Sequence, residues 1–253
     1  MKVIRIIGII ILIVLWGLVV SVPLAYQLFL HNVKSTGSNS IKNTEQKVCY
    51  LTFDDGPSYN TEKVLDVLKK YDVKATFFLI GSEIGEEDKE VLLRMKEEGH
   101  AIGLHSNVHD FDKIYTCIEE CVEDYETEQQ LLSVQYKIDT NIFRFPGGSA
   151  CTYMYGQRED YIDAMQQKGF VCFDWHVSGE DSVGNPTVYS IQKNITDHVF
   201  DYEKPIILLH DSGIANMTVD ALPGIIESVR MQGYEFGTLE EREEYVFRRK
   251  SDR

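Results

Sequence analysis

The chain has 253 residues, of which 43% are hydrophobic and 26% are charged, and its formal net charge at pH 7 is −15. This length and composition are typical of one globular domain with an additional segment. The negative charge argues against nucleic-acid binding, because phosphate contacts require a basic surface. We therefore expect no nucleic acid among the partners of this protein.

The N-terminal 30 residues differ in character from the rest of the chain. Residues 6–30 contain no charged side chain and are mostly aliphatic, while Lys2 and Arg5 precede them. A run of this length can cross a bilayer as a helix, and the preceding cations favour a cytoplasmic N-terminus. We interpret residues 1–30 as an uncleaved signal-anchor transmembrane helix, with a cleaved signal peptide as the alternative.

The polar segment 31–46, rich in Ser, Asn and Lys, follows the apolar run and predicts a flexible tether. Together the two segments predict a single-pass protein of the cell membrane whose folded domain is extracytoplasmic. We place that domain at residues 47–240 and interpret residues 241–253 as a charged tail.

Short apolar runs alternate with amphipathic helical patterns through the folded domain. This alternation predicts an α/β domain with a parallel sheet, and seven strands favour a barrel over an open sheet. The predicted helices cover 61–71, 88–99, 116–136, 158–169, 190–200 and 218–233. The predicted strands cover 48–53, 75–80, 100–105, 141–145, 170–175, 205–210 and 234–239.

Unusual polar residues cluster where the predicted strands end. Because the carboxyl ends of parallel strands in a barrel meet at one face, residues far apart in the sequence converge there. We expect an active site at that face. The residues in question are Asp54, Asp55, His105, Arg144, Asp174, Trp175, His210 and Asp211.

Two histidines and two carboxylates among these residues are candidates for a metal site. His105 and His109 are four apart, so a helical turn after the strand would place both imidazoles on one side. Asp54 and Asp55 would repel each other without a nearby cation. One of them completes a two-histidine, one-carboxylate set suited to zinc, cobalt, nickel, iron or manganese, and the other serves as a general base.

Five motifs in order resemble those of the polysaccharide deacetylase family, the NodB-homology carbohydrate esterases. The resemblance covers residues 46–240, and TFDDGP together with H-S-x-x-H is its specific part. It implies a distorted (β/α) barrel of about seven strands and metal-dependent hydrolysis of an acetyl group on a polysaccharide. The motifs are TFDDGP (52–57), HSNVH (105–109), RFPGGS (144–149), FDW (173–175) and LLHD (208–211).

The resemblance also implies a role for individual residues. Near the substrate it implies an oxyanion-binding backbone N–H after Pro146, at Gly147, with Trp175 and Leu208 lining the acetyl pocket. The chemical roles it implies are catalytic base for Asp54, metal ligand for Asp55, His105 and His109, orientation of the base for Arg144, and general acid for His210.

Two positions depart from the family pattern. Gly147 stands where the family usually has an aromatic residue, so the backbone N–H survives but the pocket wall differs. The family often has D-x-x-D-W before the acid, and its first Asp tunes the acid histidine. The sequence FDWHVSGED leaves either Asp174 or His176 near that role.

The leading hypothesis is a zinc-dependent deacetylase that acts on N-acetylglucosamine units of peptidoglycan. The resemblance also leaves open chitin oligosaccharide, an exopolysaccharide or acetylated xylan as the substrate. Two other classes compete with it: a catalytically silent carbohydrate-binding module on the same fold, and a metal-dependent amidohydrolase for a small molecule.

Overall fold

The computed structural model describes residues 46–247. The predicted signal anchor and all but one residue of the predicted tether lie outside this range. Within residues 46–247, no helix is long and apolar enough to cross a membrane.

A parallel sheet forms the centre of the domain. Its strands follow the order β5-β4-β3-β2-β1-β7-β6, and β8 pairs with the start of β1. All the strand pairs given for the described residues are parallel, which confirms the predicted α/β class. The strands are β1 (Val48–Gly56), β2 (Thr76–Leu79), β3 (Ala101–Leu104), β4 (Ile142–Phe143), β5 (Val171–Cys172), β6 (Val177–Ser178), β7 (Ile206–His210) and β8 (Glu235–Phe236).

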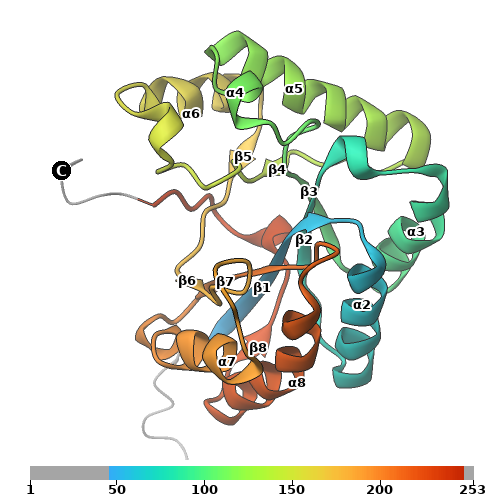
Figure 1. Ribbon diagram of the computed structural model, residues 1–253, viewed down its shortest axis with the longest axis vertical. Helices are drawn as coiled ribbons and strands as arrows, with labels where there is room; N and C mark the ends of the chain where they lie inside the picture. The colour runs from blue at the N-terminus through green and yellow to red at the C-terminus, as the bar shows by residue number, and fades with distance from the viewer. Residues whose placement is uncertain (1–45, 248–253) are drawn as a thin grey trace, which may run out of the picture. The chain divides into compact units, whose positions relative to one another are not determined.

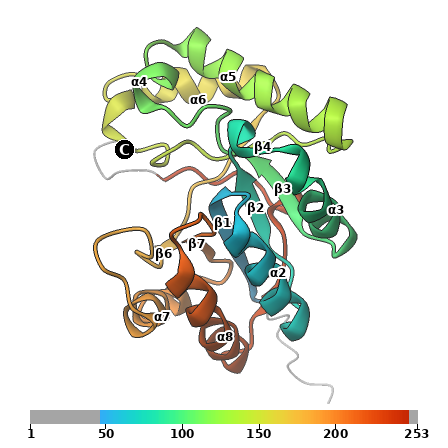
Figure 2. The ribbon, with the colours of Figure 1, turned by 45° about the vertical axis from the view of Figure 1, so that its right-hand side comes forward.

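Helices pack around the outside of this sheet. In Figures 1 and 2, α5 and α6 lie at one end of the folded domain and α7 and α8 at the other, with the strands between them. The predicted helices are present, whereas the one-turn α4 and the two-residue β6 are too short to show a periodic pattern. The helices are α2 (Tyr59–Tyr71), α3 (Lys89–Glu97), α4 (Phe111–Ile114), α5 (Ile118–Leu131), α6 (Arg158–Gln167), α7 (Val188–Thr196) and α8 (Asn216–Met231).

The strands bury both faces, and alternate side chains enter two separate clusters. The larger cluster lies between the sheet and the helices and includes Leu51, Phe77 and Leu209. The smaller cluster lies on the inner face and includes Phe78 and Ile142. The same alternation puts one inner row of residues at the carboxyl ends of the strands, namely Asp54 on β1, His105 after β3, Arg144 after β4 and His210 on β7.

The sheet is a half-barrel rather than a closed barrel. No strand pair joins β5 to β6 in the part of the chain that the structure describes. The start of the predicted tail lies against β5 instead, where Tyr245 forms a parallel bridge with Phe173. The N–H of Asp174 donates to the Tyr245 carbonyl oxygen over 2.7 Å, and the Tyr245 ring stacks on His176 with 3.9 Å between ring centroids. The strands alone therefore leave an open edge, and residues of the charged segment cover it.

Gly103 on β3 tests the packing of the inner face. A Cβ atom there would lie 2.6 Å from the Phe78 ring and 3.1 Å from Ile142. We expect Gly103→Ala to lower the free energy of unfolding by about 1–3 kcal/mol, because the inner cluster has no room for a methyl group. Urea unfolding followed by circular dichroism measures this change.

Gly213→Ala is the matched control, since a Cβ atom at Gly213 meets only Tyr59, at the ordinary contact distance of 3.5 Å. Equal unfolding midpoints for the two variants would show that the inner face is not tightly packed.

Candidate active site

A buried ion pair holds the first carboxylate of TFDDGP. Asp54 is 3% exposed and Arg144 is fully buried. Arg144 Nη1 donates to Asp54 Oδ1 over 2.7 Å and to Thr52 Oγ1 over 2.8 Å, and its Nε donates to the Phe173 carbonyl oxygen over 2.8 Å. The Asp54 carboxylate is therefore fixed through Oδ1, while Oδ2 lies on the other side, 3.7 Å from His105 Nε2.

The neighbouring carboxylate reaches the same place through an unusual backbone conformation. Adjacent residues of a strand point to opposite faces, so Asp54 and Asp55 could not both face the site from regular β-structure. Asp55 adopts a left-handed φ of 71°, and the register of β1 against β2 shifts between Asp54 and Gly56. Left-handed backbone is uncommon for residues other than glycine and often marks functional sites.

Asp55, His105 and His109 form a three-ligand cluster. Their donor atoms all lie within 4.8 Å of one another. Asp55 Oδ1 is 3.4 Å from His105 Nε2 and 3.3 Å from His109 Nε2. Burial alone would raise the pKa of Asp55, but the hydrogen bond and positive charge of His105, with smaller effects of His210 and His109, lower it to about 2. A carboxylate that stays ionised beside two imidazole nitrogens fits a divalent cation.

The orientation of His105 supports this assignment. His105 Nδ1 lies 2.9 Å from the carbonyl oxygen of Arg144. A histidine ligand commonly donates its second ring N–H to such an acceptor, which fixes the ring and leaves the other nitrogen for the metal. Nε2 is the nitrogen that faces Asp55.

The expectation of a helical turn between the two histidines is wrong. Residues 105–110 are irregular, and Ser106 and His109 have positive φ values of 76° and 50°. Helix α5 supports this loop, because the Asp124 carboxylate accepts the backbone N–H groups of Asn107 (2.8 Å) and Val108 (3.1 Å). These hydrogen bonds hold the loop in a conformation that its sequence alone does not favour.

A second acidic residue of α5 lies beneath the same loop. Glu128 is fully buried, and its Oε1 is 3.4 Å from the backbone nitrogen of His105. Burial raises the pKa of Glu128 well above its usual range. Sequence reasoning missed Asp124 and Glu128 because the acidic pattern of this helix is typical of a solvated face. Their spacing of four residues, which puts both on one face of the helix, is the signal that could have found them.

The oxyanion candidate Gly147 lies in a tight turn after β4. Gly147 and Gly148 have φ values of 74° and 76°. Gly147 is exposed, and within residues 46–247 its N–H has no hydrogen-bond partner. The Pro146 carbonyl oxygen accepts from the hydroxyl of Tyr115 over 2.8 Å, which fixes the turn from below. The Gly147 N–H is therefore free to bind a ligand oxygen.

The partner of His210 is neither of the two candidates from the sequence. Asp181 Oδ1 lies 2.9 Å from His210 Nδ1, and Asp181 Oδ2 accepts the backbone N–H of His210 and the hydroxyl of Thr218. Burial alone would lower the pKa of His210, but the hydrogen bond and charge of Asp181, with Asp54 and Asp55, raise it to about 9. Asp181 lies in the loop after β6, and that strand is too short to predict.

Asp174 and His176 have structural contacts instead. Asp174 accepts from the N–H (2.8 Å) and the hydroxyl of Ser149, and from the N–H of Phe247. It therefore connects the turn after β4 to the C-terminal segment. His176 Nδ1 accepts the N–H of Ile206 over 3.0 Å, and burial lowers the pKa of His176 to about 4.

Trp175 and Leu208, the two apolar candidates for the acetyl pocket, both lie close to site residues. Trp175 is partly buried, and its ring lies 5.6 Å from the Arg144 guanidinium carbon. A Cβ atom on Gly148 would come within 2.8 Å of Trp175, so the glycine permits this close approach. Leu208 is 6% exposed and precedes His210 by two residues on β7, which puts both on the inner row.

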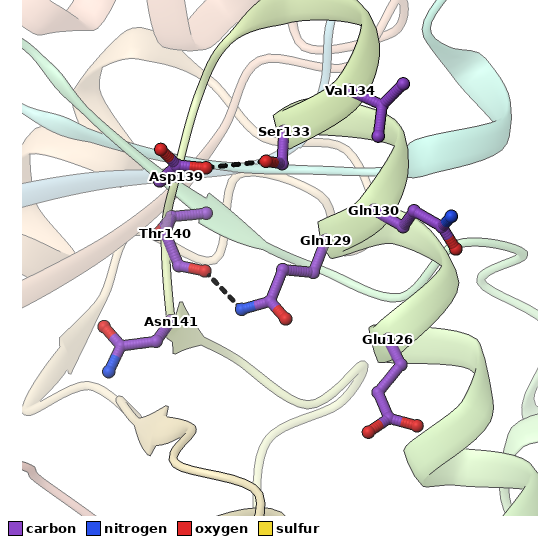
Figure 3. Close-up of a pocket in the computed structure, with 8 residues that line it drawn as sticks. All are labelled: Glu126, Gln129, Gln130, Ser133, Val134, Asp139, Thr140 and Asn141. Carbon is purple, nitrogen blue, oxygen red and sulfur yellow. Dashed lines mark hydrogen bonds between the residues drawn. The ribbon is translucent and has the colours of Figure 1, made fainter.

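A pocket of about 560 Å³ lies elsewhere, between α5 and residues 139–141, and shares no residue with the three-ligand cluster (Figure 3). Ser133 donates to Asp139 over 2.6 Å across it, and Gln129 donates to the Thr140 carbonyl oxygen over 2.6 Å. Within the described residues, this pocket contains no group of side chains that could hold a metal ion, so we place the chemistry at the cluster and not in this pocket.

The comparisons with known proteins agree with the arrangement described above. A family profile described as polysaccharide deacetylase matches residues 41–172. A peptidoglycan-N-acetylglucosamine deacetylase of Bacillus cereus is 34% identical over 213 residues, which are 83% of this chain and 75% of the relative.

Two solved structures share the fold. The catalytic domain of a peptidoglycan N-acetylglucosamine deacetylase from Eubacterium rectale superposes with a TM-score of 0.74 at 30% identity, over 85% of this chain and 98% of that one. A family 4 acetyl xylan esterase from Clostridium thermocellum, in complex with a cobalt ion, superposes with a TM-score of 0.65 at 28% identity, over 77% of this chain and 89% of that one. The chain belongs to the polysaccharide deacetylase family.

Proposed function

We propose that this protein is a divalent-metal-dependent deacetylase that hydrolyses N-acetyl groups of peptidoglycan N-acetylglucosamine. The observation that carries the proposal is that three groups of side chains lie together at the carboxyl ends of the strands. These groups are the three-ligand cluster, the Asp54–Arg144 pair and the His210–Asp181 pair. Metal-assisted hydrolysis of an amide uses three functions that these groups could supply, namely an electrophile, a base and an acid.

Asp55, His105 and His109 would hold the cation, which supplies Lewis-acid polarisation of the acetyl carbonyl when bound. Zinc is the proposed ion because it accepts two imidazoles and one carboxylate, and cobalt and nickel accept the same donors. Asp54 takes the proton of the attacking water on Oδ2, since Arg144 occupies Oδ1.

Gly147 and His210 would stabilise the oxyanion and protonate the leaving group, respectively. The free N–H of Gly147 donates to the oxyanion that develops when water adds to the carbonyl carbon. His210 then protonates the amide nitrogen, so that the C–N bond breaks and acetate and a free amine leave. The hydrogen bond from Nδ1 to Asp181 leaves Nε2 as the proton donor.

The substrate proposal is supported by the two relatives that are named for peptidoglycan N-acetylglucosamine. The acetyl xylan esterase makes acetylated xylan the main alternative. Residues 1–30 support a location at the cell membrane with the catalytic domain extracytoplasmic, since a signal anchor would hold the domain close to the wall.

Cell fractionation tests the proposed location. We expect the full chain in the membrane fraction, resistant to alkaline carbonate, because the proposed anchor would hold it in the bilayer. A chain that lacks residues 1–30 is the control and should stay soluble. A soluble full-length product shortened by the apolar segment would favour the cleaved signal peptide instead.

Acetate release tests the activity itself. With residues 40–253, we expect release from N-acetylglucosamine oligomers and from isolated peptidoglycan. A chelator should abolish the release, and added zinc, cobalt or nickel should restore it. Asp54→Asn should lower kcat by about 100-fold or more, because the base is lost while the shape of the side chain is kept.

Metal binding by the Asp54→Asn variant, measured by calorimetry, is the control for that loss. An unchanged affinity for the metal would show that the variant loses activity because it lacks the base. If the native protein binds metal but releases no acetate from any of these polymers, the silent carbohydrate-binding module becomes the better description.

The pH profile tests the acid. The pKa of His210 is raised to about 9, so the protonated form is present at neutral pH and is lost as the pH rises through that value. We expect kcat/KM to fall above about pH 9. Asp181→Asn removes the charge that stabilises the imidazolium, so this alkaline limb should move to lower pH by about one unit or more.

Asp174→Asn is the matched control for this prediction. Its carboxylate bonds to Ser149 and Phe247 rather than to His210, so the alkaline limb should keep its position even if the rate falls. The assignment of Asp181 as the partner of His210 would be overturned if the alkaline limb moved in Asp174→Asn and kept its position in Asp181→Asn.

A further inference from the structure

A row of aromatic rings begins at the metal-ligand candidate His109. The ring of Phe111 lies 5.8 Å from that of His109 and 5.3 Å from that of Tyr153, measured between centroids. Phe111 is partly buried and Tyr153 is 53% exposed. Figures 1 and 2 show α4, which begins at Phe111, beside the segment that leads into α6. The row therefore runs from the three-ligand cluster to the surface.

Phe111 also fills the space beside the oxyanion candidate. A Cβ atom on Gly147 would lie 3.2 Å from Phe111 Cε1 and 3.3 Å from Cys151 Cβ. The φ of 74° at Gly147 disfavours any side chain at that position. The aromatic wall of the site is thus supplied by a different segment of this chain.

Buried contacts hold the two rings in place. Tyr115 is 8% exposed, and its ring lies 5.8 Å from that of Phe111 and 6.0 Å from that of Tyr153. The Tyr115 hydroxyl donates to the Pro146 carbonyl oxygen, which fixes Tyr115 to the turn that contains Gly147. A surface that is already ordered loses little conformational entropy when a ligand binds.

We propose that Phe111 and Tyr153 form a stacking surface for the sugar ring next to the one that is deacetylated. This inference rests on the proposed function, because it takes the cluster of Asp55, His105 and His109 as the reaction centre. The occupant is a β-linked glucosamine-type pyranose, whose equatorial substituents leave both ring faces lined by C–H groups. Such a face packs on an aromatic ring while the hydroxyl groups stay in water.

Oligosaccharide binding tests the proposal without turnover. In an Asp54→Asn background, we expect Tyr153→Ala to raise the Kd for an N-acetylglucosamine tetramer by about three- to tenfold, in the range of aromatic pair contacts. Tyr153→Phe should restore the parent Kd, since the ring is kept. Tyr155→Ala is the matched control, because Tyr155 is 84% exposed in the same segment and should leave the Kd unchanged.

An acetate-release assay of the protein with Asp54 intact distinguishes a failure of this proposal from a failure of the proposed function. If the native protein is active and Tyr153→Ala leaves both the Kd and the KM within twofold, the stacking surface is refuted. An equal effect of Tyr155→Ala would refute it as well. If no acetate is released but tetramer binding still depends on Tyr153, the proposed function fails while the sugar-binding surface stands.

Discussion

The buried ion pair between Arg144 and Asp54 is the constraint on which the site depends. The guanidinium group is fully buried, lies 4.3 Å above the Phe78 ring and donates to Thr52 and Asp54 of β1 and to the carbonyl oxygen of Phe173, which follows β5. Removal of either partner would leave an unpaired charge in the interior, at a cost of about 3–5 kcal/mol. The carbonyl oxygen of Arg144 also receives His105 Nδ1. Arg144 therefore orients both the candidate base Asp54 and the candidate metal ligand His105.

Two of the metal-ligand candidates, Asp55 and His109, are positioned by different means from the acid–base candidates. Asp54 and His210 are paired residues of β1 and β7, so the register of two adjacent strands sets their separation. Asp55 and His109 depend on left-handed backbone, which the surrounding structure must stabilise. For the histidine loop this support comes from Asp124 on α5. The acidic helix is thus part of the site although it contributes no ligand.

The fold class and the strand-end residues of the site could be predicted because they follow from strand periodicity. Asp54, His105 and His210 stand at the ends of apolar runs, and parallel strands bring such ends together. Asp181 could not be found in this way, because it follows a strand of two residues. The prediction of a closed barrel was wrong for a related reason. Tyr245 lies in a charged segment without β-pattern, and its pairing with β5 depends on tertiary contacts.

The division between strand register and loop conformation means that two properties of the protein can change independently. Substitutions or insertions around His109 would alter the geometry of the three metal-ligand candidates and hence which ion they could hold. They leave the spacing of the proton donor and acceptor intact, because that spacing is set within the sheet. The proposed metal preference could therefore be altered through the loop that contains His109, while the strand register that spaces Asp54 and His210 is kept.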